Sequence, residues 1–304
     1  MRIGINGGGA TIDRIVEQAV TAEEDGFTSL WYASAVFGDP LAAMAAAGRA
    51  TKSIELGTSV LQTYTCHPVL QANRAASTAA TMDRPGLTLG VGPSHAPAIE
   101  GMLGMSYAGV GAHTEEYVKV LGTLLRGEGI SHKGEHFNVN IPQVAPLPQP
   151  VSLMLSALAP RLLRVAGEMT DGTILWMANA RSIETHVAPK ISAAAKSADR
   201  PAPRIVAGLP VAVHDDVVEA RAKAAKDFAG YGVLPNYRRI LDLGDAPGPG
   251  DAAIVGDEAA VTAQIQGLFD AGATDVWAAP FPVGDDRSES RRRTRELLKE
   301  LANA

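Results

Sequence analysis

Short apolar and β-branched runs alternate with amphipathic helical segments along almost the whole chain. Eight of these runs have the length and composition of buried strands, and each is followed by a helical segment or a longer insertion. The expected strands are residues 2–5, 28–32, 54–60, 87–91, 151–155, 173–176, 204–213 and 275–278. Eight strand–helix units predict an α/β fold, namely a (β/α)8 TIM barrel, with an open doubly wound sheet as the alternative.

Two stretches interrupt this rhythm. Residues 93–150 form an insertion after the fourth strand, with an expected helix near residues 113–126 and a hairpin around Lys133-Gly134. Residues 231–257 are rich in Gly, Pro and Asp, which predicts a loop-rich region before the last helix–strand unit and a candidate lid. The sequence has no linker or internal repeat, so we expect residues 1–304 to form one domain.

The composition narrows the class of protein. With 46% hydrophobic residues in 304, the chain can bury a sizeable core, and its net charge of −6 argues against nucleic acid as a partner. The single cysteine, Cys66, excludes an intrachain disulfide and fits a reducing compartment. The apolar stretches are interrupted by charges and the chain opens directly with a strand, so we expect a cytoplasmic protein with no membrane partner.

The expected carboxyl ends of the strands carry few acids or bases. They lack a pair of carboxylates, a lysine suited to a Schiff base and a cluster of metal ligands, so no metal site is expected. The residues at these ends are Asn6, Ser34, Ser59, Val60, Gly92, Ser94, His95, Ser156, Ala157, Trp176, Met177, Pro280 and Phe281. Such a rim suits a planar organic cofactor that supplies the chemistry, although small residues also occur there for packing alone.

Other motifs have structural explanations. Gly7-Gly8-Gly9 follows the first strand but lacks the spacing of a dinucleotide-binding loop. His132 and His136 are four residues apart on an expected hairpin rather than a helix, so we interpret them as surface histidines. The arginines at 291–293 alternate with glutamates, which is typical of a solvated helix face.

Several segments, in this order and spacing, resemble the bacterial luciferase-like monooxygenase superfamily. Within it, the chain is most similar to actinobacterial oxidoreductases that use the 5-deazaflavin coenzyme F420. The matching segments are residues 23–31, 56–68, 89–92, 127–137 and 155–176, the last containing Ser156-Ala157-Leu158-Ala159-Pro160-Arg161. The resemblance implies the same barrel, an insertion, and a homodimer formed by the early helices.

The resemblance also implies a cofactor site. In relatives, the third strand ends in a bulge with a non-proline cis peptide behind the cofactor ring, which here corresponds to the Ser59–Val60 bond. The start of the helix at Pro160 is expected to favour an anionic tail. The expected cofactor-binding residues are Asn6, Ser34, Ser59, Val60, Gly92, Pro93, Ser94, Ala157, Leu158, Ala159, Trp176 and Met177.

These features predict an oxidoreductase in which reduced F420 passes a hydride to a small activated alkene, imine or carbonyl compound. His95 is the expected proton donor, and Trp176, Met177, Phe37 and Tyr64 are expected to wall the substrate. Residues 31–36 lack the imidazole that a sugar-phosphate dehydrogenase of this type needs, which argues against glucose 6-phosphate as substrate. The alternatives are an FMN-dependent monooxygenase and a non-catalytic flavin-binding barrel.

Overall fold

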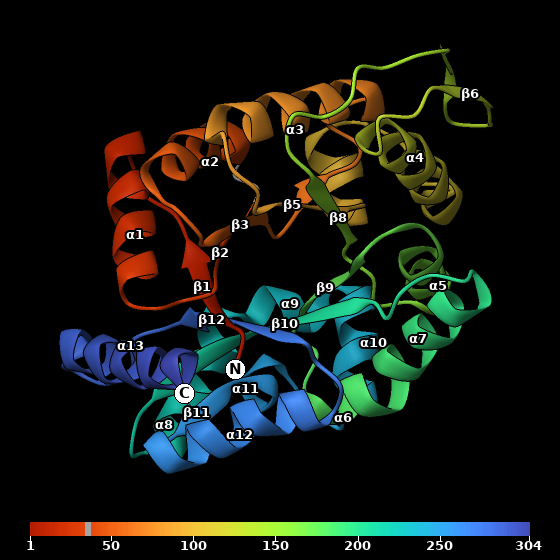
Figure 1. Ribbon diagram of the computed structural model, residues 1–304. Coiled ribbons are helices and arrows are strands. Elements are labelled where there is room, and N and C mark those ends of the chain that lie inside the picture. Colours follow the sequence, from red (N-terminus) through yellow and green to blue (C-terminus); the bar gives the residue numbers. More distant parts are fainter. Residues whose placement is uncertain (34–37) are drawn as a thin grey trace.

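The computed structural model, which describes residues 1–33 and 38–304, is built around a closed barrel of eight parallel strands (Figure 1). The first four barrel strands are β1 (Ile3–Gly7), β2 (Ser29–Tyr32), β3 (Glu55–Thr58) and β5 (Leu87–Gly92). The other four are β8 (Val151–Leu155), β9 (Gly172–Trp176), β10 (Arg204–Val213) and β12 (Asp275–Pro280). Because β12 pairs with β1 and β9 pairs with β10, the sheet closes, which excludes the open doubly wound alternative.

Helices surround the barrel and connect its strands (Figure 1). The longer ones are α1 (Ile12–Glu24), α2 (Pro40–Ala50), α3 (Pro68–Met82), α4 (Val110–Leu125), α5 (Pro160–Met169), α7 (Ala188–Ser197), α8 (Val217–Asp227), α12 (Glu258–Asp270) and α13 (Arg287–Asn303). Their starts follow local chemistry. The Thr11 side chain accepts a hydrogen bond from the backbone of Arg14, and α2, α3 and α5 each have proline at the first helical position.

The two irregular stretches are more ordered than their composition suggests. The insertion contains the π-helical turn η1 (Pro97–Met102) and the predicted hairpin, formed by β6 (Ile130–Lys133) and β7 (Asn138–Ile141). The stretch 231–257 includes part of α9 (Ala229–Val233), then α10 (Pro235–Leu243), α11 (Pro249–Ala252) and the short strand β11 (Ile254–Gly256), which extends the pairing of β10. The remaining elements are β4 (Leu61–Gln62), α6 (Ala180–Ser182) and η2 (Ile183–Val187).

Two tryptophan rings fill the centre of the barrel. Trp31 and Trp277 are almost fully buried, and glycines on neighbouring strands make room for them. A Cβ atom on Gly57 would overlap the ring of Trp31, and one on Gly208 would overlap the indole of Trp277. The glycines therefore let two large side chains, from the strands on either side of β1, pack inside the barrel.

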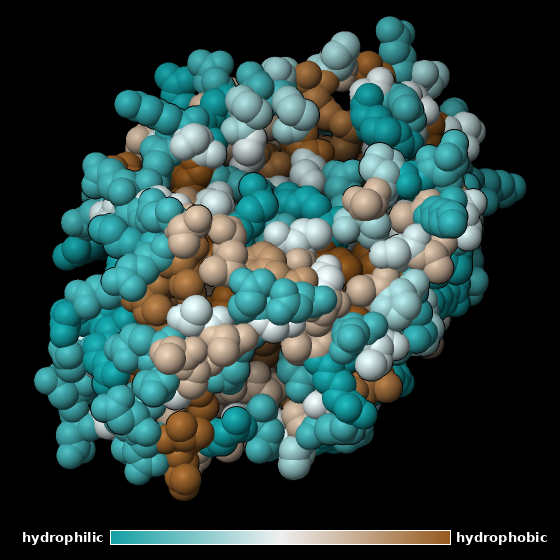
Figure 2. Space-filling model, turned by 60° about the horizontal axis from the view of Figure 1, so that its bottom comes forward, coloured by the Kyte–Doolittle hydropathy of each residue, from teal (hydrophilic) through white to brown (hydrophobic). Residues whose placement is uncertain are grey.

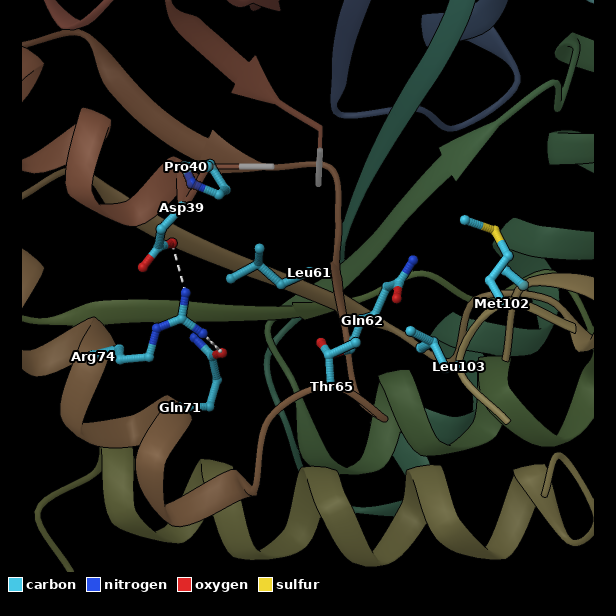
Figure 3. Close-up of a pocket in the computed structure, with 11 residues that line it drawn as sticks. Asp39, Pro40, Leu61, Gln62, Thr65, Gln71, Arg74, Met102 and Leu103 are labelled. Carbon is cyan, nitrogen blue, oxygen red and sulfur yellow. Dashed lines mark hydrogen bonds and ion pairs between the residues drawn. The ribbon is translucent and has the colours of Figure 1, made fainter. Parts of the chain in front are cut away.

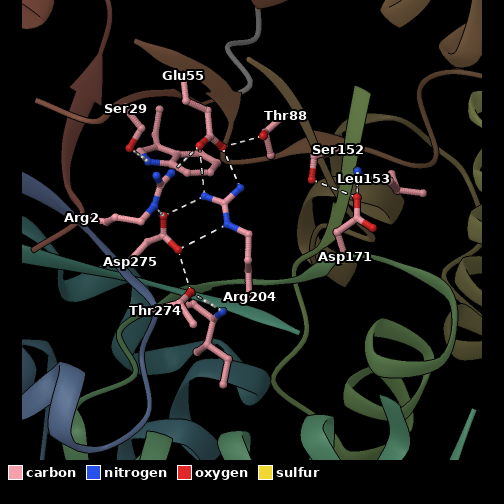
Figure 4. A network of polar contacts seen from close by, with 12 residues as sticks. Arg2, Ser29, Glu55, Thr88, Ser152, Leu153, Asp171, Arg204, Thr274 and Asp275 are labelled. Carbon is pink, nitrogen blue, oxygen red and sulfur yellow. Dashed lines mark hydrogen bonds and ion pairs between the residues drawn. The ribbon is translucent and has the colours of Figure 1, made fainter. Parts of the chain in front are cut away.

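Ion pairs close the opposite, amino-terminal end of the barrel (Figure 4). Arg204 pairs with Glu55 at 3.0 Å and with Asp275 at 2.7 Å, and Arg2 pairs with the same two carboxylates. The Asp275 side chain is only 2% exposed. Arg204 therefore neutralises a carboxylate that would be costly to bury unpaired. We interpret this end of the barrel as contributing to stability rather than to the functional site.

On the face that Figure 2 shows, hydrophilic side chains predominate toward the edge, and apolar and weakly polar ones adjoin one another across the centre. Among the described residues, no helix combines the length and the apolar character needed to cross a membrane.

Candidate functional site

A cavity of about 340 Å³ opens at the carboxyl ends of β5 and β8. This is the end of a TIM barrel at which active sites form. Eight residues predicted from the sequence line it, namely Val60, Gly92, Pro93, Ser94, His95, Ser156, Leu158 and Ala159. The other lining residues are Tyr107, Val110, Gly111, Arg161, Leu162, Asn236 and Tyr237.

The floor of the cavity forms where β3 ends. The Ser59–Val60 peptide bond is cis, as the resemblance implied, and β4 follows it at Leu61. Val60 then lies beside Gly92, where an added Cβ atom would come within 2.9 Å of Val60 Cγ2 and 3.1 Å of Ser156 Cβ. Glycine at this position therefore leaves space between the two strand ends that any side chain would fill.

The wall after β5 is held by a tyrosine that the sequence analysis did not single out. Ser94 adopts a left-handed conformation with φ of 63°, which is uncommon for a residue other than glycine. The Tyr107 hydroxyl donates a 2.7 Å hydrogen bond to the Ser94 carbonyl. Residues in such conformations persist where the surroundings hold them and often occur at functional sites.

His95 follows this turn and is half-buried against α10. The centroids of the His95 and Tyr237 rings lie 5.2 Å apart. Desolvation by burial lowers the pKa of His95 below its usual value of 6.5, so the imidazole is predominantly neutral at pH 7. Residues from the expected loop-rich stretch therefore cover the predicted proton donor.

The start of α5 forms the positively charged end of the cavity. Ala159 is the N-cap residue and has no side-chain oxygen to bond the free backbone N–H groups that follow it. Arg161, in the first turn, lies against Gly111 of α4 and pairs with Glu115 at 3.0 Å. The helix N-terminus and the guanidinium both favour an anionic group at this edge.

The remaining predicted site residues do not line this cavity. Ala157 is fully buried and its backbone N–H donates to the Thr173 hydroxyl at 3.2 Å. Met177 is also buried, with φ of 63°, and Asn6 is exposed at the end of β1. Ser34 and Phe37 fall outside the described residues.

Trp176 lies at the carboxyl end of β9, the strand that pairs with β8. Its ring stacks on Trp277 with centroids 5.0 Å apart, and Phe228 and Tyr231 meet it edge-on. The Trp176 indole N–H and the Ser59 hydroxyl are buried without a hydrogen-bond partner among the described residues. Such groups are costly unless a ligand or water pairs with them. A ring that carries carbonyl and nitrogen acceptors would satisfy both groups, so this donor set fits a flavin or deazaflavin.

The interpretation of His132 and His136 as surface histidines is wrong. Both are half-buried because the hairpin packs on α4. His132 Nε2 lies 3.4 Å from the Glu116 carboxylate, and His136 Nε2 is buried without a partner among the described residues. The sequence pattern predicted both the hairpin and a helix near residues 113–126, but not that the two pack against each other.

The site residues that the sequence analysis missed come from distant segments. Tyr107, Val110 and Gly111 belong to the insertion, and Asn236 and Tyr237 belong to α10. Arg161 was part of a matching segment, and its place directly after Pro160 could have identified it.

Comparisons with known proteins agree with the barrel fold. The chain matches the model of the luciferase-like monooxygenase family over residues 2–302. The F420-dependent glucose-6-phosphate dehydrogenase of Amycolatopsis mediterranei is 27% identical over 201 residues, which cover 61% of this chain and 60% of that protein.

Two solved structures share the fold at low sequence identity. The coenzyme F420-dependent tetrahydromethanopterin reductase of Methanopyrus kandleri has a TM-score of 0.75 and 19% identity, with 98% of this chain and 97% of that chain covered. The oxygenating constituent of 3,6-diketocamphane monooxygenase from Pseudomonas putida, in complex with FMN, has a TM-score of 0.72 and 20% identity, with 100% and 98% covered.

Proposed function

Since the chain belongs to the luciferase-like monooxygenase family, we propose that it is an oxidoreductase that binds coenzyme F420 at the carboxyl end of its barrel. The observation that carries the proposal is the cavity between β5 and β8, whose floor is opened by Gly92 beside Val60. Its volume of about 340 Å³ lies at the lower end of the range for small-molecule sites. The F420-dependent relative favours this cofactor over FMN.

The proposed site assigns distinct roles to its edges. Val60, Gly92 and Ser156 would support the cofactor ring, and the unpartnered Ser59 hydroxyl and Trp176 indole would donate to its polar atoms. When bound, the deazaflavin supplies a hydride carrier, and the chemistry of electron transfer is its own. The protein contributes position and exclusion of water, because Tyr237 and its neighbours cover the cavity from α10.

The negative tail of the cofactor would lie at the start of α5. The uncapped N–H groups after Ala159 and the guanidinium of Arg161 converge on this end of the cavity. Glu115, which now pairs with Arg161, holds the guanidinium at the rim. An incoming phosphate would compete with this carboxylate for the arginine.

His95 is the proposed proton donor to the substrate. Its lowered pKa means that the protonated form becomes common only below pH 6.5. Reduction of a substrate would therefore speed up as the pH falls through the pKa of His95. The reverse oxidation needs the neutral imidazole as a base and would be favoured above it.

A titration of the purified protein with F420, FMN and FAD tests the proposal. We expect saturable quenching of F420 fluorescence with one site per chain, and weaker binding of both flavins. Stoichiometric FMN on the protein with no affinity for F420 would support the FMN-dependent monooxygenase instead. Bound F420 that no hydride donor or acceptor ever reduces or oxidises would point to a non-catalytic barrel.

We further propose that two copies of the chain associate through their early helices. A groove runs between α2 and α3, and Leu70 on its edge is 55% exposed. Light scattering on the wild type and on Leu70→Glu tests this, because a charge in the interface should shift a dimer toward monomer. A monomeric wild type at micromolar concentration would contradict it.

A further inference from the structure

A second cavity of about 290 Å³ lies on the other side of the segment that follows β5 (Figure 3). It is bounded by the start of α2, by β4 and α3, and by η1. Leu61 lines this cavity, whereas the preceding residue, Val60, lines the proposed cofactor cavity. The two cavities are therefore adjacent across β4 and the chain from His95 to η1.

One end of the second cavity is polar. Arg74 Nη2 pairs with Asp39 Oδ1 at 2.6 Å, and Arg74 Nη1 donates to Gln71 Oε1 at 2.8 Å (Figure 3). Gln71 is 1% exposed, and its Nε2 has no hydrogen-bond partner among the described residues. A buried amide with two unused N–H groups is destabilising unless something accepts from it.

The other end is apolar. Met102 and Leu103 stand across the cavity from the Arg74–Asp39 pair, with Leu61 between them (Figure 3). Met102 is 68% exposed and Leu103 44% exposed, so two adjacent large apolar side chains face solvent at this end. The cavity thus has a buried donor at one end and uncovered apolar surface at the other.

We propose that this second cavity binds the part of an apolar substrate that carries an uncharged carbonyl oxygen. Gln71 Nε2 would donate to that oxygen, and the apolar body would lie on Leu61, Met102 and Leu103. A neutral carbonyl fits better than a carboxylate because Asp39 already compensates the charge of Arg74 at 2.6 Å. An anion would be repelled by that carboxylate.

That the carbonyl compound is a substrate rests on the proposed oxidoreductase function, but its binding in the second cavity does not. Isothermal titration with three probes that share one skeleton separates the contribution of the polar group from that of the apolar body. Benzylacetone carries a carbonyl, hydrocinnamate carries a carboxylate, and butylbenzene carries neither. We expect benzylacetone to bind about tenfold more tightly than each of the others, the equivalent of one hydrogen bond to a buried donor. Tighter binding of hydrocinnamate, or equal binding of all three probes, would overturn the proposal.

Variants locate the binding. Gln71→Leu should weaken benzylacetone about tenfold and leave butylbenzene unchanged, with the exposed Gln266→Leu on α12 as matched control. If Gln71→Leu fails to fold, Gln71→Met keeps the side-chain length and serves the same purpose. Unchanged benzylacetone binding in a folded Gln71 variant would refute the role of this amide.

Met102→Ser should weaken both benzylacetone and butylbenzene, whereas Val218→Ser, which is 79% exposed on α8, should weaken neither. Benzylacetone that binds equally to the Met102 variant and the wild type would place the ligand elsewhere. The F420 titration, run on the same proteins, keeps the two proposals apart. If F420 binds and the probes do not, only the proposal for the second cavity is refuted. If the probes bind and F420 does not, only the proposed function is refuted.

Discussion

Replacing Glu116 with glutamine tests how the hairpin is held on α4. The Glu116 carboxylate accepts backbone hydrogen bonds from Glu135 at 2.9 Å and from His136 and Phe137 at 3.0 Å each. Burial opposes ionisation, but these three N–H groups and His132 outweigh it and lower the pKa of Glu116 from 4.5 to about 2. The carboxylate is therefore much more stable in the folded protein than in the unfolded chain.

The magnitude follows from this difference in pKa. Each pKa unit corresponds to about 1.4 kcal/mol, so the ionised carboxyl contributes at most roughly 3 kcal/mol. The Glu116 side chain is 16% exposed, which leaves little screening by solvent. Glutamine keeps one carbonyl acceptor, so we expect Glu116→Gln to destabilise the hairpin by about 2 kcal/mol at pH 7.

The pH dependence gives the sharper test. Because folding lowers the pKa of Glu116, its contribution is complete above pH 4.5 and is lost as the pH falls through about 2. Hydrogen exchange at the amides of Glu135, His136 and Phe137 should be faster in the variant at pH 7, and the difference should shrink between pH 4.5 and 2. The exposed Glu24→Gln on α1 is the control. Equal protection at pH 7, or a difference that persists undiminished at pH 2, would refute the reasoning.

Three further predictions concern the site and the barrel. His95→Asn should slow substrate reduction and abolish the rise of its rate toward acidic pH; a retained pH profile would rule out His95 as the proton donor. Gly57→Ala should cost about 1–3 kcal/mol in urea denaturation because its Cβ would overlap a buried tryptophan ring, whereas Gly267→Ala, with open space around it, should be neutral or stabilising by about 0.5–1 kcal/mol. Arg204→Met should lower the free energy of unfolding by about 3 kcal/mol, and with it the melting temperature, because the buried Asp275 keeps only its ion pair with Arg2. An unchanged melting temperature would contradict that role.

The sequence predicted those parts of the fold that depend on local chemistry. The cap at Thr11 and the prolines at 40, 68 and 160 mark helix starts, and the eight apolar runs mark the barrel strands within a few residues. The cis bond at Ser59–Val60 could not be derived from propensity and came only from the family resemblance. Residue propensities predict a trans bond at almost every position that does not precede proline, so they do not predict a cis bond that depends on the tertiary structure.

The rest of the site depends on contacts between distant segments. Tyr107 holds Ser94 from 13 residues away, and Tyr237 meets His95 from another element altogether. Likewise, Glu116 binds the hairpin 19 to 21 residues further along the chain, which buries the histidines that the sequence placed on the surface. Periodicity identifies which face of an element is apolar, but it does not identify which partner covers that face.

The most direct test of the account is F420 binding to a protein whose cavity floor has been filled. Ser156 lies at the end of β8 beside Gly92, so Ser156→Leu would occupy the space proposed for the ring, and Ser192→Leu on the exposed side of α7 is the matched control. We expect an F420 dissociation constant at least about tenfold higher for Ser156→Leu, a loss of about 1.4 kcal/mol or more, and no change for the control. Wild-type affinity in a correctly folded Ser156→Leu protein would contradict the proposed site.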